Sequence, residues 1–189
     1  FDADHAAGLP ELLDRIPVAV VYAPDAGGSG THACRIRSAL DRLDVPLRLL
    51  NRQSSQVVSG NGLVAKIVHP VETPIPLGSG NARSLGVELA AGDTRITILG
   101  DLDGEALVRL APELDKTDIL IAPHHGSRRA AVQGLRERVS PDTVVVCCGR
   151  NNRYHFPSRD FRELFSHVTF RTTADEGEIR ISIKIPANR

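Results

Sequence analysis

The stretch ILIAPHHGS, residues 119–127, decides the architecture that this sequence predicts. It opens with an apolar run of the length of a buried strand and ends in proline, two histidines, glycine and serine. A second stretch of this kind, residues 98–102, is an apolar run that ends in Gly100-Asp101. Polar groups directly after buried strands predict a site at the edge of a sheet.

On either side of these two stretches, short apolar runs alternate with segments whose apolar residues have the spacing of a helix. Strands are predicted over residues 18–22, 47–50, 63–68, 119–122 and 143–148, and helices near 36–43, 105–110, 130–139 and 159–165. Residues 85–90 and 95–99 flank a turn composition that predicts a β-hairpin. Ile179, Ile181, Ile183 and Ile185 alternate with polar residues and predict a closing one-sided strand. The pattern predicts one α/β domain over residues 1–189, with helices covering the outer faces of sheets.

Bulk composition excludes some classes of protein. The 23 basic and 23 acidic residues leave no net charge, so nucleic-acid binding must come from a local cluster. No apolar run reaches the length of a membrane helix. The three cysteines do not form a disulfide framework, and we expect buried thiols. The chain begins at Phe1 and holds no methionine, so we expect a piece of a longer protein.

Three short motifs carry candidate chemistry. Phe1-Asp2-Ala3-Asp4-His5 places two carboxylates and an imidazole before a helix, although an acidic, frayed terminus has the same composition. Asp101 can bridge two metals, although a simple turn is the alternative. His124 and His125, if they continue a strand, face opposite ways, so that one binds metal while the other orients substrate. A structural turn remains the alternative for the pair.

The ordered set of these motifs resembles the metallo-β-lactamase superfamily and, within it, the C-terminal domain of ComEC-type DNA-internalisation proteins. Asn81-Ala82-Arg83-Ser84 is similar to the Asn-x-x-Ser segment before the family's central hairpin, and residues 149–154 resemble its late loop. The chain departs from the family twice. Ile121 stands where lysine is usual, and Phe156 precedes Pro157 where the family has histidine, with His155 one position earlier.

The resemblance implies an αβ/βα sandwich whose N-terminal strands are missing from this piece, together with a further histidine before Phe1. It implies two divalent metals held by Asp2, Asp4, His5, Asp101 and His125, with Asp4, Asp101 and His124 taking part in catalysis. Carboxylates such as Asp2 favour Mn²⁺, while the imidazoles keep Zn²⁺ open. The implied reaction is hydrolysis of DNA phosphodiesters during DNA uptake.

The same resemblance implies a partner and a location. The partners are DNA and a membrane channel domain of the same parent chain, and no obligate protein partner is evident. The domain would be a soluble part of a membrane protein, on the extracytoplasmic side of a bacterial inner membrane. Substrate contacts are expected from Ser127, Arg128, Arg150 and Asn152, with Arg129 and Arg153 adding positive charge. Two alternatives are a hydrolase of small phosphodiesters or esters and a non-catalytic DNA-guiding module.

Overall fold

The computed structural model describes residues 1–24, 28–50, 58–60, 62–70 and 80–183. The chain divides into two compact units, residues 1–50 and residues 51–189, called here unit 1 and unit 2. Each unit has its own sheet and its own buried cluster. The prediction of a single domain over residues 1–189 stays a prediction.

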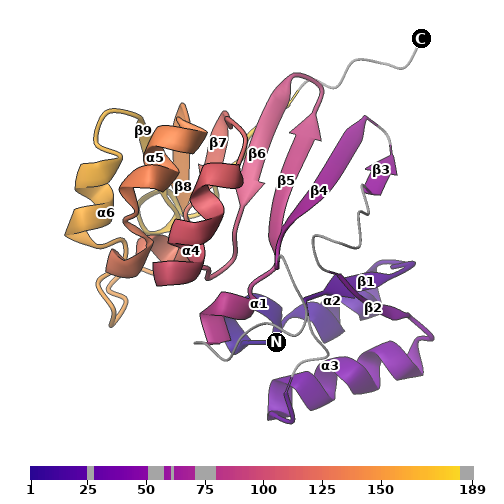
Figure 1. The fold of residues 1–189 in the computed structure, drawn as a ribbon. Helices are drawn as coiled ribbons and strands as arrows, with labels where there is room; N and C mark the ends of the chain where they lie inside the picture. Colours follow the sequence, from indigo (N-terminus) through magenta and orange to yellow (C-terminus); the bar gives the residue numbers. More distant parts are fainter. Residues whose placement is uncertain (25–27, 51–57, 61, 71–79, 184–189) are drawn as a thin grey trace. The chain divides into compact units, whose positions relative to one another are not determined.

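Unit 1 is built around a β-α-β crossover (Figure 1). Strand β1 pairs in parallel with β2, and α3 connects them. Apolar residues of α3 follow helical spacing and bury Ile36 and Leu40 against Leu13 of α2. The elements are α1 (Ala3–Ala6), α2 (Leu9–Arg15), β1 (Val21–Ala23), α3 (Thr31–Arg42) and β2 (Leu47–Leu49).

Unit 2 contains a mixed sheet of seven strands in the order β3-β4-β5-β6-β7-β8-β9. The pairs from β3 to β6 are antiparallel, and those from β6 to β9 are parallel. The strands are β3 (Val58–Gly60), β4 (Leu63–His69), β5 (Gly86–Ala91), β6 (Thr94–Ile98), β7 (Ile119–Ile121), β8 (Thr143–Val146) and β9 (Thr169–Thr172).

Helices of unit 2 cover the parallel part of its sheet, as Figure 1 shows for α4, α5 and α6. The main core lies between them and includes the fully buried Leu107, Leu120, Leu135, Val144 and Phe161. The α-helices are α4 (Gly104–Leu110), α5 (Gln133–Val139), α6 (Arg159–Leu164) and α7 (Thr173–Glu176). The 3₁₀ turns are η2 (Gly80–Arg83), η3 (Ala111–Glu113), η4 (Pro123–Gly126) and η5 (Arg128–Ala130).

The α/β fold class and the hairpin of β5 and β6 are confirmed. The closing strand is wrong over the residues described: no strand is present between Gly177 and Ile183, Ile181 is 41% exposed, and Ile185 lies outside the described residues. Alternation supplies one apolar face, but a strand also needs a partner for its backbone groups. The last described strand is instead β9, which pairs with β8.

The cysteines are all free, as the prediction of no disulfide framework requires. The expectation that they are buried is wrong for Cys34 and Cys147, which are exposed. Cys147 comes directly after the last residue of β8, beyond the buried run Val144–Val146. The cysteine pair therefore belongs to the loop after the strand.

Candidate metal and phosphate site

The candidate site of unit 2 lies where its parallel strands end. Register pairs Ile98 of β6 with Ile121 of β7, and Ile121 with Val145 of β8. The residues directly after these strands therefore meet at one edge of the sheet, which is where ligands bind in open parallel sheets. They are Gly100-Asp101 after β6, the histidine pair after β7 and the loop from Cys147 onward after β8.

Gly100 allows the backbone to turn close beside the segment that follows η2. Its φ is +55°, and an added Cβ would lie 3.1 Å from the Cβ of Ser84. The next residue, Asp101, donates its backbone N–H to the Ser84 Oγ at 3.0 Å. Gly100 and Ser84 together fix the backbone at Asp101, from which its carboxylate extends.

The histidine pair lies in a left-handed turn, which corrects the expectation of a continued strand. His124 has φ 45° and ψ 47°, and His125 has φ 52° and ψ 25°. The turn is held because the His124 N–H donates to Gly100 O at 2.9 Å and the Ser127 N–H donates to His124 O at 2.9 Å. Non-glycine residues with positive φ cost conformational energy, and such strain gathers at functional sites. The two imidazoles differ through their partners, without strand alternation.

His125 is oriented toward Asp101. Its Nδ1 lies 2.8 Å from Cys147 O, and because a carbonyl only accepts, Nδ1 carries the proton. Nε2 lies 3.5 Å from Asp101 Oδ1. A histidine that donates one ring N–H to a backbone carbonyl and presents the other nitrogen beside a carboxylate has the usual arrangement of a metal ligand. The Asp101–His125 pair fits a divalent cation of borderline hardness.

His124 is held by a carboxylate that the sequence did not single out. Its Nδ1 lies 2.8 Å from Asp103 Oδ2, in a side chain that is only 3% exposed. The same oxygen accepts from Asn81 Nδ2 and lies near Arg129 Nε, both at 3.2 Å. Among the described residues, the buried Asp103 Oδ1 has no hydrogen-bond partner. Asp103 therefore contacts the side chains of His124, Asn81 and Arg129, and the His124 Nε2 atom lies on the side of the ring away from this carboxylate.

Several expected substrate contacts have structural partners in unit 2. The buried Ser127 accepts a hydrogen bond from the Ala130 N–H at 3.3 Å and caps η5. Arg150 Nε donates to Ala174 O at 2.7 Å, and Arg128 Nε lies 2.8 Å from Asp160 Oδ2. Arg128 is 85% exposed, so it can exchange this partner for a phosphate. The expectation of substrate contact stays a prediction for all of these residues.

Asn152 organises the late loop. Its Nδ2 donates to Gly149 O at 3.0 Å and to Phe156 O at 2.8 Å, while its Oδ1 accepts from the Phe156 N–H at 2.8 Å. Both hydrogens of its amide are thus donated within the loop. The role of Asn152 is therefore to close the segment from Gly149 to Phe156, and a substrate contact by this residue is a prediction without geometric support.

Phe156 borders both imidazoles of the candidate site. Its ring centroid lies 5.6 Å from that of His124 and 6.2 Å from that of His125. The following Pro157 packs against Gly126, where an added Cβ would meet the Pro157 Cβ at 2.7 Å. The position at which the resemblance has a histidine thus holds an apolar wall in this chain. His155, one position earlier, is exposed.

The remaining predicted ligands lie in unit 1. Asp2 is the N-cap residue of α1, and its backbone oxygen accepts from the N–H groups of His5 and Ala6 at 3.2 and 2.9 Å. Asp4 and His5 are in the helix itself, and both are exposed. The D-x-D-H motif therefore presents its three side chains from one helical turn, and the expectation that these side chains bind metal stays a prediction.

Comparison with known proteins agrees with the motifs. ComE operon protein 3 of Bacillus subtilis (strain 168) is 29% identical over 188 residues, which are 97% of this chain and 24% of that protein. Recombination protein 2 of Haemophilus influenzae is 27% identical over 183 residues, 96% of this chain and 21% of that protein. These matches confirm the resemblance to ComEC-type proteins, and the chain spans about a quarter or less of the length of either relative.

Two solved structures also align with the chain. One, described as a metal-dependent hydrolase from Parabacteroides distasonis, is 14% identical, covers 85% of this chain and 78% of that chain, and gives a TM-score of 0.48. The other, described as a Zn-dependent hydrolase from Thermotoga maritima, is 13% identical. The alignment covers 82% of this chain and 81% of that chain and gives a TM-score of 0.46. Both TM-scores lie below 0.5, so neither alignment carries weight in the assignment.

Among the described residues, no helix combines the length and the apolar character needed to cross a membrane.

A sequence model of the metallo-β-lactamase superfamily matches residues 1–150, which include the D-x-D-H, Gly-Asp and His-His motifs. The chain therefore belongs to the metallo-β-lactamase superfamily.

Proposed function

We propose that this chain is a metal-dependent phosphodiesterase that hydrolyses DNA. Members of its superfamily are generally metal-dependent hydrolases. The observation that carries the proposal is the pairing at the sheet edge, where Asp101 and His125 lie 3.5 Å apart and the neighbouring His124 is oriented by Asp103. A ligand pair beside an oriented imidazole suits hydrolysis better than binding alone.

The proposed metal centre would hold two divalent cations. Asp101 and His125 are proposed ligands because of their geometry, with Asp101 as the bridging carboxylate, and Asp2, Asp4 and His5 because of the order of motifs in the sequence. Cations at such a site lower the pKa of water and stabilise charge on phosphate oxygens. Three carboxylates among five ligands favour Mn²⁺ over Zn²⁺, since hard oxygen donors suit Mn²⁺.

The protein's own groups position the phosphate. His124 presents Nε2 away from Asp103, and when the ring is protonated at both nitrogens Nε2 can donate to a phosphate oxygen or to the leaving oxygen, while Asp103 keeps the ring in one orientation. Phe156 lies against both imidazoles and makes that side of the site apolar. Arg128 and Arg129 follow the histidine turn directly, so they can pair with phosphates on either side of the one being cleaved.

DNA is the proposed polymer for two reasons. The two curated relatives are ComEC-type proteins, one of them named Recombination protein 2. The arginines of the candidate site also supply local positive charge that the neutral total does not. We further propose that the chain acts during DNA uptake, beside a membrane channel domain of the same parent protein on the extracytoplasmic side of the inner membrane.

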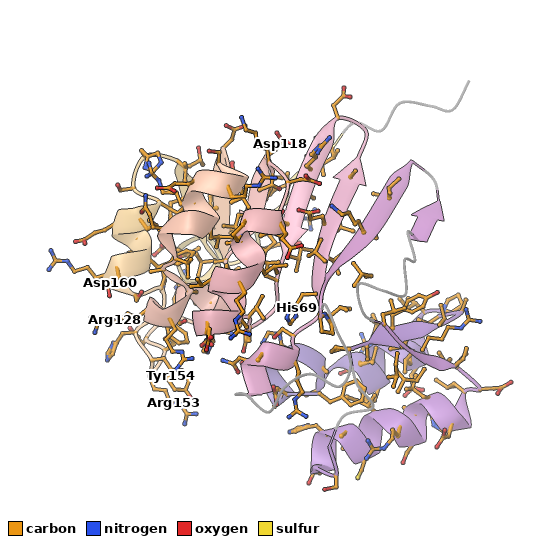
Figure 2. All side chains as sticks on the ribbon, in the orientation of Figure 1. His69, Asp118, Arg128, Arg153, Tyr154 and Asp160 are labelled. Carbon is orange, nitrogen blue, oxygen red and sulfur yellow. The ribbon has the colours of Figure 1, made fainter. Side chains whose placement is uncertain are left out.

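The test is hydrolysis of labelled DNA by the purified chain with Mn²⁺, with and without chelator. Asp101→Asn should lose most of the activity because a bridging ligand is weakened. The matched control is Asp118→Asn, since Asp118 precedes β7 and lies at the opposite end of unit 2 from Arg128 (Figure 2). Equal activity of the Asp101 variant and the native chain would refute the assignment. Cleavage of a small phosphodiester without cleavage of DNA would favour the small-substrate hydrolase, and no turnover with metal bound would favour the guiding module.

A further inference from the structure

The late loop of unit 2 carries an aromatic stack whose outer ring, Tyr154, has no role in the proposed metal chemistry. Tyr154 stacks on Phe156 with centroids 5.3 Å apart and an interplanar angle of 21°. Phe156 in turn stacks on His125 at 6.2 Å and 25°. The three rings form a column that runs from a proposed metal ligand to the surface, where Tyr154 is 58% exposed.

The column is held in place by the loop around it. Asn152 closes the loop through its three hydrogen bonds with Gly149 and Phe156. The Ser158 N–H donates to Gly126 O at 2.8 Å, so the loop is also tied to the histidine turn. A large exposed ring that is already ordered loses little entropy on binding a ligand. Tyr154 is therefore suited to contact a flat partner.

Charge identifies the class of partner. The exposed Arg153 lies over the Tyr154 ring with its Cζ 4.6 Å from the centroid, and its guanidinium donates to the Tyr154 hydroxyl. A base that stacks on Tyr154 therefore takes the place of this guanidinium, which can turn to a phosphate of the same strand. Figure 2 places Arg128 at the same end of unit 2 as Arg153 and Tyr154. A flat ring beside guanidinium groups matches a ligand that combines a planar base with phosphates.

We propose that Tyr154, supported from behind by Phe156, forms a stacking platform for an unpaired nucleobase next to the phosphodiester that the site cleaves. This inference rests on the proposed function, because it states which form of DNA the proposed phosphodiesterase site prefers. In a duplex, neighbouring base pairs cover the faces of each base, whereas an unpaired base offers a free face. The platform therefore favours single-stranded over double-stranded DNA and tolerates any base, since every base has a π face.

The first experiment uses tryptophan fluorescence, because the native chain contains no tryptophan and two tyrosines. Tyr154→Trp is titrated, in EDTA to prevent hydrolysis, with a single-stranded oligonucleotide, with an abasic oligonucleotide of equal length, and with a blunt duplex. We expect quenching by the base-bearing single strand and little by the other two. Tyr22→Trp, which places the indole on β1 of unit 1, is the matched control and should show no base-dependent quenching.

The second experiment measures the dissociation constants of the same oligonucleotides by fluorescence anisotropy. Tyr154→Ala should weaken binding of the base-bearing single strand about tenfold and leave abasic binding unchanged, while Tyr154→Phe keeps the native values. Arg153→Ala should weaken binding to both strands, whereas Arg162→Ala, which removes the guanidinium that lies over the Phe170 ring, should weaken neither.

Two results would overturn the platform: native affinity of Tyr154→Ala for the base-bearing strand, or equal quenching of Tyr154→Trp by abasic and base-bearing strands. Failure of the proposed function looks different, since both assays work without turnover. If the native chain never cleaves DNA but still distinguishes base-bearing from abasic strands, the stacking platform is supported and the proposed nuclease activity is refuted. If the chain cleaves DNA but does not distinguish the two kinds of strand, the proposed nuclease activity is supported and the stacking platform is refuted.

Discussion

The Nδ1 atom of His124 lies 2.8 Å from Oδ2 of Asp103, and this contact joins the turn after β7 to the start of α4. The carboxylate accepts a hydrogen bond from the Nδ1–H group and thereby fixes which ring nitrogen faces away from it. Asp103 acts on the proposed chemistry through His124 and through the neighbouring Arg129, so it is a positioning residue.

Replacing Asp103 should therefore slow turnover while the metal content stays the same. Asp103→Asn keeps the volume but loses the charged acceptor, and outer partners of this kind are worth about 10- to 100-fold in activity. We expect kcat to fall by that factor with little change in KM. The measurement is steady-state hydrolysis together with elemental analysis, with Asp118→Asn as control. Loss of metal in Asp103→Asn would make this residue a ligand.

His125→Ala and His124→Ala should separate metal binding from turnover. His125 Nε2 lies beside Asp101, so its removal should lower the bound metal and the rate together. His124 has Asp103 as its partner, so its removal should leave the metal in place and lower the rate alone. Elemental analysis of both purified variants gives the answer. The reverse pattern would exchange the two roles.

Asp2→His should shift the metal preference of the chain toward Zn²⁺. A carboxylate oxygen suits Mn²⁺, while an imidazole nitrogen suits Zn²⁺. We expect the native chain to turn over faster with Mn²⁺ than with Zn²⁺ at matched occupancy, and the gap to narrow or reverse in the variant. An unchanged rank order in the two proteins would remove Asp2 from the ligand set. Asp14→His, on α2 of the same unit, controls for an added imidazole.

His69 should make the stability of unit 2 depend on pH. Burial lowers the pKa of its imidazole below the ordinary value of 6.5, and the opposing hydrogen bond to Ser84 O is the smaller effect. Below pH 6.5 the unfolded chain therefore binds a proton at this residue that the folded chain does not. The free energy of unfolding should fall as pH drops from about 6.5 toward the lower folded pKa, by at most about 1.4 kcal/mol per pH unit.

The check is urea unfolding of the native chain and of His69→Gln at pH 7.5 and pH 5.5. The variant should lose less stability between the two values, because it has no proton to gain at this position. His167→Gln, which changes an exposed histidine, should behave like the native chain. An equal loss in the native chain and His69→Gln would show that other groups set the acid sensitivity.

Much of unit 2 could be predicted from its sequence because buried strands and polar strand ends leave a local pattern. Residues 119–122 read as a strand, and Asp101, His124 and His125 read as a site at its end. The turn of the histidine pair could not be predicted, since two non-glycine residues with positive φ contradict local propensity and depend on bonds to Gly100 and Ser127.

Asp103 was missed for a related reason. An aspartate directly before a helix is the ordinary sequence signal of an N-cap, and Asp103 does occupy that position of α4. Its side chain makes no capping bond there and turns instead to His124, which is 21 residues away in the sequence. Only the three-dimensional structure distinguishes the two uses of the same residue. Asn81, which bonds to the same carboxylate, was visible only through the resemblance.

The closure of the late loop by Asn152 bears on how such a protein can acquire new substrates. Because the amide bonds within its own segment, residues 149–156 keep their shape with few demands on the rest of the fold. Substitutions at Arg153 and Tyr154 can then change what is recognised while the strand ends that carry Asp101 and His125 stay as they are. Substitutions that change recognition can thus leave the proposed metal ligands unchanged, and exchange of this one segment between relatives is a direct route to an altered substrate preference.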